Sequence, residues 1–405
     1  MSKSINVPKL RFKEFSGEWE EKLFCDIVTN KSKKYNPERE SISYKCIELE
    51  HLSTESGQLL GYVDSLNLGS IKNKFNKNDV LFGKLRPYLK KYLLAPFDGV
   101  CSSEIWVLNG INVTNYFLYY IVQSDYFIGL ANQSSGSKMP RADWNIIENS
   151  IFFIPQKQEQ EKIASFLTSV DTKIEQLTKK EELLQQYKKG VMQKIFNQEI
   201  RFKADDGSEF CEWEENKLGD IGITYNGLTG KTSENFGSGK PYIQYKQIFD
   251  NSRITIDGFG YVSIEPNEKQ NKVQFGDIFF TTSSETPNEV GFTSVLLDNV
   301  EEVYLNSFCF GYRAKSLDIL NPYFAKFLFR SDNFRRKVIE LAQGSTRYNI
   351  SKLELMKTLI QLPCLEEQTK IANFLSAIDS KIEKVQKQLN SIKEFKKALL
   401  QQMFV

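Results

Sequence analysis

The sequence predicts an α+β protein in which two strand-rich globular modules are separated by two long antiparallel α-helices, with a pseudo-two-fold internal repeat. Three observations predict this class. The chain repeats its own framework, the end of each repeat has coiled-coil periodicity, and the segments between have the short apolar runs and turn residues of strands. With 405 residues, 40% of them hydrophobic and 26% charged, the chain can form two or three domains with packed cores.

The internal repeat is strongest at its closing end. Residues 155–196 align without a gap with residues 363–404, at an offset of 208, and 17 of the 42 positions are identical. At the opening end, Glu18-Trp19-Glu20-Glu21 matches Glu212-Trp213-Glu214-Glu215 at an offset of 194. The middles diverge, which favours two modules with the same task on different targets, although a duplication that drifted without purpose leaves the same pattern. The predicted segments are a first module at 1–154, a helix at 155–198, a second module at 199–362 and a helix at 363–405.

The two closing segments have apolar residues alternately four and three positions apart, which predicts an a/d seam over about five heptads. Each helix of about 40 residues would be about 60 Å long. Because the second helix leaves the second module, pairing requires it to run back along the first, so the pair should be antiparallel. Charged residues interrupt the seam at Glu181, Lys188 and Lys396. The predicted seam residues are Ile163, Leu167, Val170, Ile174, Leu177, Leu184, Ile371, Leu375, Ile378, Ile382, Val385, Leu389 and Ile392.

Within the modules, runs rich in β-branched and aromatic residues predict strands, and two amphipathic stretches, 116–130 and 322–341, predict helices. The predicted strands are 42–49, 79–83, 104–108, 151–154, 242–248, 277–282, 292–297 and 303–312.

The composition argues against several kinds of function. The single histidine, His51, disfavours a histidine-dependent catalytic triad, a multi-histidine metal centre and a histidine pH switch. The six cysteines are scattered without a C-x-x-C pair, which is typical of free thiols in a reducing compartment. There is no signal-like segment and no run long enough to span a membrane. We therefore expect a cytoplasmic chain without catalytic residues, metal ligands or membrane contact.

Local clusters of cations are the main signal for a nucleic-acid partner, because the net charge of the whole chain is only +2. Between residues 69 and 92, seven Lys or Arg residues accompany one acid, Asp79, and Arg330, Arg335, Arg336 and Lys337 cluster on a predicted helix. Polar loops precede both closing helices. Such side chains contact phosphates and base edges, although a charge cluster is often only a solvated surface. The candidate DNA-binding residues are Lys31, Lys33, Lys34, Lys72, Lys74, Lys84, Arg86, Lys90, Ser137, Lys138, Arg141, Lys231, Lys240, Ser345, Thr346, Arg347 and Tyr348.

Three features together resemble the specificity subunit of type I restriction–modification enzymes. They are the order module–helix–module–helix, the Gly-Ser-Thr-Arg-Tyr-Asn-Ile-Ser loop at 344–351, and the Asp-Val-Leu-Phe-Gly-Lys-Leu-Arg-Pro-Tyr segment at 79–88. The resemblance covers essentially the whole chain. The first module departs from it, with Met139-Pro140-Arg141 where the second has Arg347-Tyr348-Asn349.

The resemblance implies a non-catalytic subunit in which each globular module, a target-recognition domain, recognises one half of a bipartite, asymmetric site in double-stranded DNA. The helix pair would set the spacing and dock two copies of a modification subunit. That partner would bind S-adenosylmethionine and methylate adenine. A restriction subunit that uses ATP and Mg²⁺ would join the complex for cleavage, so no cofactor is expected in this chain.

Two other functions stay open at this point. A coiled-coil scaffold with two protein-binding modules would explain the repeat and the seam, with the basic loops incidental. A free-standing nuclease or methyltransferase would need an active-site motif, and the sequence shows none. Sequence-selective binding to a duplex separates the first hypothesis from the scaffold, and activity of the isolated chain would support the enzyme.

Overall fold

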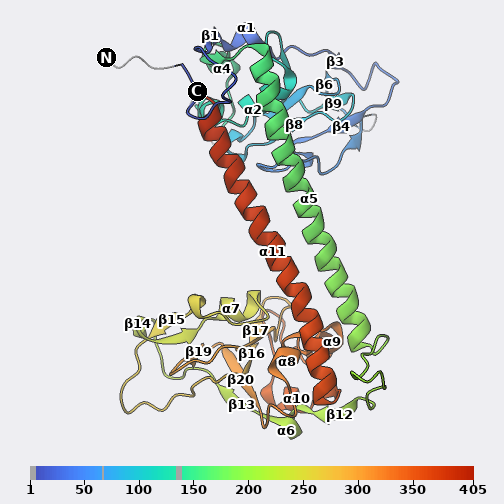
Figure 1. Cartoon of the computed structure of the whole chain (residues 1–405), viewed down its shortest axis with the longest axis vertical. Helices are drawn as coiled ribbons and strands as arrows, with labels where there is room; N and C mark the ends of the chain where they lie inside the picture. The colour runs from blue at the N-terminus through green and yellow to red at the C-terminus, as the bar shows by residue number, and fades with distance from the viewer. Residues whose placement is uncertain (1–5, 66–67, 134–138) are drawn as a thin grey trace. The chain divides into compact units, whose positions relative to one another are not determined.

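The computed structural model describes residues 6–65, 68–133 and 139–405 and divides into two compact units. Unit 1 comprises Met1–Lys179 and Gln386–Val405, and unit 2 comprises Lys180–Val385. Each unit therefore contains one globular module and a part of each long helix (Figure 1).

The long helices α5 and α11 each continue from one unit into the other, and the remaining helices are short. The α-helices of the described residues are α1 (Phe24–Ile27), α2 (Asn115–Ile121), α3 (Asp125–Ala131), α4 (Trp144–Glu148), α5 (Lys157–Phe196), α6 (Leu218–Ile221), α7 (Tyr245–Asp250), α8 (Pro322–Leu328), α9 (Asp332–Glu340), α10 (Lys352–Met356) and α11 (Leu365–Met403).

The strands are mostly shorter than the predicted runs. Those of unit 1 are β1 (Glu20–Leu23), β2 (Val28–Thr29), β3 (Lys34–Tyr35), β4 (Lys45–Ile47), β5 (Val63–Asp64), β6 (Lys72–Phe75), β7 (Val80–Gly83), β8 (Tyr92–Leu94), β9 (Gly99–Cys101), β10 (Ile105–Gly110) and β11 (Ile151–Ile154). Those of unit 2 are β12 (Glu214–Lys217), β13 (Gly222–Asn226), β14 (Phe236–Ile243), β15 (Gly260–Val262), β16 (Ile278–Thr281), β17 (Ser283–Ser284), β18 (Thr293–Val295), β19 (Tyr304–Leu305), β20 (Cys309–Ala314), β21 (Tyr348–Asn349) and β22 (Leu359–Leu362).

Both units contain the same framework. A four-stranded antiparallel sheet has the order β2-β10-β7-β8 in unit 1 and β13-β20-β16-β18 in unit 2, and a two-stranded ribbon, β1-β11 or β12-β22, joins the two ends of each module. The registers correspond, because Ile105 lies opposite Gly83 as Cys309 lies opposite Thr281. The internal repeat predicted from the sequence is therefore confirmed as a repeat of the fold.

A second sheet differs between the units. Unit 1 has a five-stranded sheet, β3-β6-β9-β4-β5, and unit 2 has a three-stranded sheet, β15-β14-β19. Each contains one parallel pair, β4 with β9 and β14 with β19. The segments that diverge most in sequence thus build the sheet that differs most in structure.

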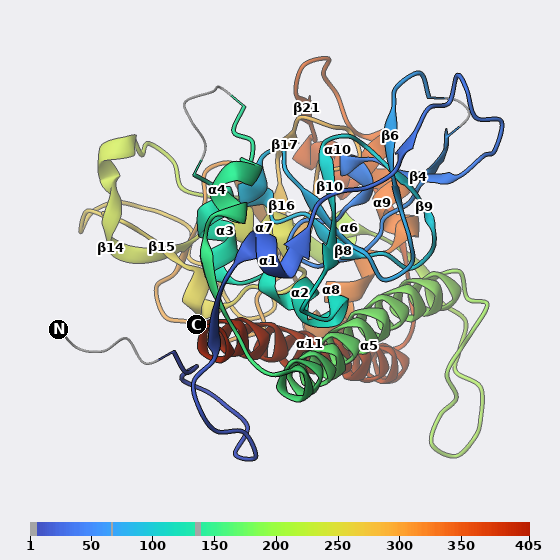
Figure 2. The same ribbon diagram turned by 90° about the horizontal axis from the view of Figure 1, so that it is seen from above.

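Within each unit, the start of one long helix and the end of the other contribute to the same core. In unit 1 the core contains Ile163 and Leu167 from the start of α5 and Met403 from the end of α11, and Phe404 stacks on Phe117 of α2 at 5.5 Å. In both views, the end of α11 lies beside the start of α5 and near α2 (Figures 1 and 2). In unit 2 the core contains Ile195 of α5 and Ile371 of α11. The predicted antiparallel direction is confirmed.

Ten of the thirteen predicted seam residues are buried, and Ile174, Leu184 and Ile392 are half-buried. Two of the charges that interrupt the seam form ion pairs between the helices. Lys396 pairs with Asp171 at 2.7 Å in unit 1, and Lys188 pairs with Asp379 at 2.5 Å in unit 2. Polar contacts inside an apolar seam fix the register of a helix pair, so these interruptions contribute specificity to it.

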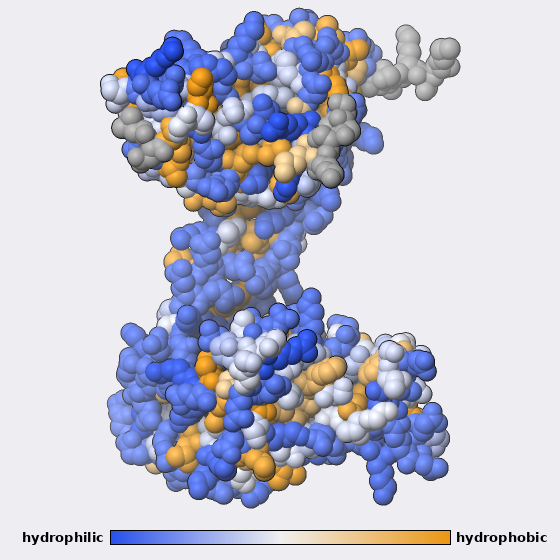
Figure 3. Space-filling model, turned by 180° about the vertical axis from the view of Figure 1, so that it is seen from behind, coloured by the Kyte–Doolittle hydropathy of each residue, from blue (hydrophilic) through white to orange (hydrophobic). Residues whose placement is uncertain are grey.

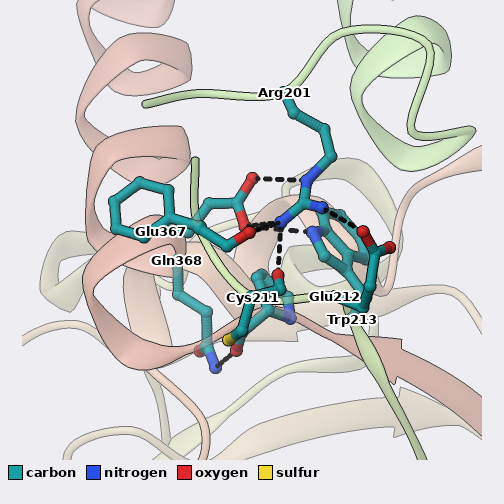
Figure 4. A network of polar contacts seen from close by, with 8 residues as sticks. Arg201, Cys211, Glu212, Trp213, Glu367 and Gln368 are labelled. Atoms are coloured by element: carbon teal, nitrogen blue, oxygen red, sulfur yellow. Dashed lines mark hydrogen bonds and ion pairs between the residues drawn. The ribbon is translucent and has the colours of Figure 1, made fainter. Parts of the chain in front are cut away.

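In each module, a buried glutamate links the start of the module to the first turns of the helix that ends it, and Figure 4 shows this cluster in unit 2. Glu367 is fully buried and accepts hydrogen bonds from Arg201 at 2.9 Å and from the Trp213 indole at 3.1 Å. Glu159 of α5 does the same with Arg11 at 2.7 Å and with Trp19 at 3.3 Å. The hydrogen bond to Glu367 also raises the pKa of Arg201. These two clusters, the carboxylate clasps, explain why the Arg, Trp and Glu positions agree between the repeats.

The glutamines next to these glutamates, Gln160 and Gln368, form further hydrogen bonds at the starts of the same helices. The side chain of Gln368 accepts a hydrogen bond from the Asn321 N–H at 2.9 Å and donates one to the Pro363 carbonyl at 2.9 Å. Gln160 makes the equivalent bonds with Thr114 and Pro155, both at 3.0 Å. The identical Glu-Gln pairs of the two helices therefore have the same structural task.

Several predicted elements are wrong in extent. The predicted helices 116–130 and 322–341 are each split in two, because Ser124 and Ser331 cap a new helix by accepting hydrogen bonds from the N–H groups of Phe127 and Phe334. The predicted strand 242–248 ends at Ile243, where the chain turns into α7, since tertiary packing overrides strand propensity. The run 303–312 is divided into β19 and β20 by a turn at 306–308.

Candidate DNA-recognition surface

Each unit has one edge where three chain segments run side by side at the end of the framework sheet. In unit 1, the Lys84 N–H donates to the Glu104 carbonyl at 2.9 Å, and the Ala142 N–H donates to the Lys84 carbonyl at 2.8 Å. In unit 2, Thr282 donates to Phe308 at 3.1 Å and Ile350 donates to Thr282 at 3.1 Å. We call these places the recognition edges. They correspond residue by residue, and each includes the end of the loop that precedes the closing strand and helix.

The recognition edge of unit 1 is basic. Lys84 is half-buried, and Arg86 and Arg141 are exposed. Arg86 has a φ of 53°, in the left-handed region, and its N–H donates to the Pro140 carbonyl at 2.8 Å. Arg141 donates to Glu104 at 3.1 Å while its side chain stays 59% exposed. Three predicted DNA-binding cations are thereby brought to one edge.

The recognition edge of unit 2 is polar and aromatic instead. Ser345, Thr346 and Arg347 are exposed, and the half-buried Tyr348 pairs with Ser284. A cavity of about 460 Å³ opens here, and its lining includes Tyr245, Ser283, Ser284, Glu289, Phe308 and Arg347. The Tyr245 hydroxyl donates to the Ser283 carbonyl at 2.8 Å, and burial raises its pKa. Two serines, an arginine, three aromatic residues and two glutamates, Glu285 and Glu289, thus line one cavity.

The other predicted cations of unit 1 lie in and before the five-stranded sheet. Lys31 and Lys33 are exposed, whereas the Lys34 ammonium donates to Asn73 at 2.5 Å. Lys72 is buried and pairs with Glu48 at 2.6 Å, and Lys74 pairs with Glu40 at 2.5 Å. A DNA phosphate would therefore have to compete with a carboxylate for Lys72 and Lys74.

Each of the other three candidate lysines that the structure describes lies beside a glutamate. Lys90, whose φ is 48°, lies 3.5 Å from Glu55. In unit 2, Lys240 pairs with Glu302 at 2.5 Å, and the nearly buried Lys231 side chain pairs with Glu268. Ser137 and Lys138 lie outside the described residues.

The Lys231–Glu268 pair predicts a measurable pH dependence. Hydrogen bonds from Lys231 and Gln270 lower the pKa of Glu268 from 4.5 to about 2. A carboxylate whose pKa is lower in the folded chain stabilises it above the unfolded pKa, and this stabilisation is lost as pH falls from about 4.5 to about 2. Lys231→Met should therefore lower the melting temperature near neutral pH, and the difference from wild type should shrink towards pH 2. Lys269→Met, at an exposed neighbour, is the control, and an unchanged pH profile for Lys231→Met would contradict this role.

Two arginines of the predicted basic cluster, Arg330 and Arg335, stabilise the fold of unit 2 through hydrogen bonds to the main chain. Arg335 is buried and donates to the main-chain carbonyls of Asn288, Val290 and Gly291, and Arg330 donates to four others. The ring of Phe292 lies within 5.2 Å of the Arg330 guanidinium and within 4.6 Å of the Arg335 guanidinium. Burial lowers the pKa of both arginines to about 10. The prediction of a basic DNA-facing cluster is wrong for Arg330 and Arg335, because their guanidinium groups donate hydrogen bonds to main-chain carbonyls of unit 2.

Other kinds of site find little support in the described part of the chain. It contains no group of three or more His, Cys, Asp or Glu side chains arranged to hold a metal ion. No helix described is long and apolar enough to cross a bilayer. Cys46 and Cys309 are buried free thiols, and burial raises the pKa of Cys46 to about 12. On the face shown in Figure 3, hydrophilic residues cover most of each unit, with hydrophobic residues scattered among them.

The chain thus contains two copies of one framework, and the corresponding edges of the two copies have different side chains. The family model of the type I restriction modification DNA specificity domain matches the chain twice, at residues 18–185 and 211–394. The chain belongs to this family.

Named relatives and solved structures agree with this assignment. The chain is 27% identical over 323 residues to the type I restriction enzyme MjaVIII specificity subunit of Methanocaldococcus jannaschii, covering 75% of this chain and 72% of the relative. It is 25% identical to the putative MjaX specificity subunit of the same organism, covering 98% and 95%. The S subunit of a type I restriction-modification system from M. genitalium has the same fold, with a TM-score of 0.57, 16% identity and coverage of 98% and 99%.

Proposed function

We propose that this chain is the specificity subunit of a type I restriction–modification complex and that each unit recognises one half of a bipartite, asymmetric site in double-stranded DNA. The observation that carries the proposal is the pair of recognition edges. They have the same main-chain hydrogen bonds, Ala142 to Lys84 and Ile350 to Thr282, but different side chains. A constant frame with variable side chains suits two readers of two different half-sites.

The long helices would set the distance between the half-sites and provide the docking surface for two modification subunits. Two equivalent readers suit half-sites about one helical turn apart, or ~34 Å. S-adenosylmethionine would bind to the modification subunit, and ATP with Mg²⁺ to a restriction subunit. This chain would then be a non-catalytic component of a cytoplasmic complex.

Arg347 provides the direct test of the proposed DNA contact. Its side chain is exposed at the recognition edge of unit 2, beside Ser345 and Thr346. Arg347→Ala should weaken binding of the full chain to a duplex containing its site. If Arg347 contacts a phosphate, the salt dependence should flatten, and if it contacts a base, the preference at one position should relax by about 1–3 kcal/mol.

The control for this test is Arg253→Ala, because Arg253 is also an exposed arginine of unit 2 but pairs with Asp298 at 3.0 Å. Unchanged affinity and an unchanged methylation pattern for Arg347→Ala would remove that residue from the interface. Competition by a duplex of unrelated sequence at rising salt tests the whole proposal. A protein-binding scaffold would show no sequence-selective component, so that result would favour the alternative function.

A further inference from the structure

We infer that positions 104 and 308 set the base preference of the two units, Glu104 by holding Arg141 against a guanine and Phe308 by contacting the methyl group of a thymine. This inference rests on the proposed function and adds the residues and base types to it.

The two positions occupy the same place in the repeated framework. Each directly precedes the central strand of its sheet, β10 or β20, and each offers its carbonyl to the first residue after the neighbouring strand, Lys84 or Thr282. Main-chain hydrogen bonds therefore hold both positions at the recognition edge. At this shared position, unit 1 has a carboxylate and unit 2 has a phenyl ring. Such a difference is expected if the two units recognise different DNA sequences.

In unit 1, the Glu104 carboxylate is directed to one cation. Its Oε1 accepts a hydrogen bond from Arg141 at 3.1 Å, and its Oε2 is shielded from solvent and accepts none in the described part of the chain. The Arg141 side chain remains 59% exposed, so part of its fork of N–H donors faces solvent. Arginine pairs best with the O6 and N7 atoms of guanine, which accept two parallel hydrogen bonds in the major groove. Glu104 is thus placed to act as a positioning residue for the Arg141 guanidinium.

In unit 2, Phe308 replaces the carboxylate and is 65% exposed beside the cavity that Arg347 also lines. A phenyl ring has no hydrogen-bonding group with which to distinguish donors from acceptors. The C5 methyl group of thymine is the apolar feature of the major-groove base edges, and contact with it favours an apolar side chain. The exposed ring shares its cavity with Ser283, Ser284 and Arg347 and with the carboxylates of Glu285 and Glu289. These polar groups can form hydrogen bonds with base edges, so the ring fits a thymine methyl group among otherwise hydrogen-bonded bases.

The test selects preferred sites from a pool of random-sequence duplexes with the full chain and with four variants. Arg141→Lys keeps the charge but removes the two-bond fork, so the preference for guanine at one position should fall roughly fivefold or more. Glu104→Gln should relax the same position without weakening total affinity, because it removes a negative charge near the DNA. Phe308→Ser should relax one thymine in the opposite half-site, whereas Phe308→Leu, which stays apolar, should retain it.

The controls are Lys22→Ala and Leu317→Ala, both at exposed positions outside the recognition edges, and thermal melting verifies that every variant is folded. A motif that is unchanged in Arg141→Lys, or equal effects of Phe308→Ser and Phe308→Leu, would overturn the inference. So would Arg141→Lys and Phe308→Ser acting on the same half-site. Wild-type chain that selects no motif would instead refute the proposed function, so the two failures are distinguishable.

Discussion

Replacing Glu367 with alanine is expected to destabilise unit 2 by about 3–5 kcal/mol, the usual cost of removing one partner from a buried ion pair. The variant leaves the Arg201 guanidinium with only the exposed Glu212, at 3.5 Å, as a carboxylate partner, and it leaves the Trp213 indole N–H without its acceptor, next to the core that α11 forms. Urea denaturation, with hydrogen exchange used to localise the loss to unit 2, measures the change.

Two further variants control this prediction. Glu366→Ala changes the exposed neighbour and should shift stability by about 0.5 kcal/mol or less. The double variant Arg201→Met/Glu367→Met should lose less than the sum of the two single changes, because it leaves no unpaired charge. A loss below about 1 kcal/mol for Glu367→Ala would show that the carboxylate clasp contributes little to the fold.

Exchanging residues 20–154 for the corresponding module of another chain with the same framework should replace the first half-site completely and leave the second unchanged. The structure supports these limits, because Glu20 of β1 lies directly opposite Ile154 of β11, so the module enters and leaves the framework at one place. Mapping methylated adenines after co-expression with the modification subunit would show which half of the site has changed.

The reciprocal exchange is the matched control for the first. Residues 214–362 are bounded in the same way, since Glu214 of β12 lies opposite Leu362 of β22, and their exchange should change the second half-site alone. If either exchange altered both half-sites, the two units would not recognise DNA independently. A methylation map with one uninterrupted motif would contradict the bipartite site itself.

The sequence predicted the repeated features well because they are periodic or identical. The seam spacing identified both long helices, and the matching segments 155–196 and 363–404 contain the identical Glu159-Gln160 and Glu367-Gln368 pairs, which the structure shows as buried. Residues that bond through side chains across long sequence distances were not predictable. The Arg11–Glu159 pair joins positions 148 residues apart, and no local pattern in the sequence indicates such a partner.

The recognition edges were only partly predictable. The exposed cations Arg86 and Arg141 were identified from composition, but the same criterion also selected Lys72, which the structure buries beside Glu48. Charge clusters show which residues are cationic and not which of them already have a carboxylate partner. Glu104 and Phe308 gave no signal of their own. Their importance follows from the strand registers that place them at the same point of the two units, and a comparison of aligned copies at that register could have found them.

The buried Arg335 and the half-buried Arg330 have a consequence for how the loop between β17 and β18 can diversify. Together they bind main-chain carbonyl groups on both sides of Phe292, including those of Asn288, Val290 and Thr293. Every amino acid offers a carbonyl, so exposed residues of the loop that leads from β17 into β18, such as Glu285 and Asn288, can be exchanged while these hydrogen bonds persist. Val290, which is buried, and Gly291, whose φ is 64° and where an added Cβ would meet Val338 and Ile350, cannot. Substitutions at these exposed positions should therefore leave the path of the loop intact, as long as the two arginines and the ring between them persist.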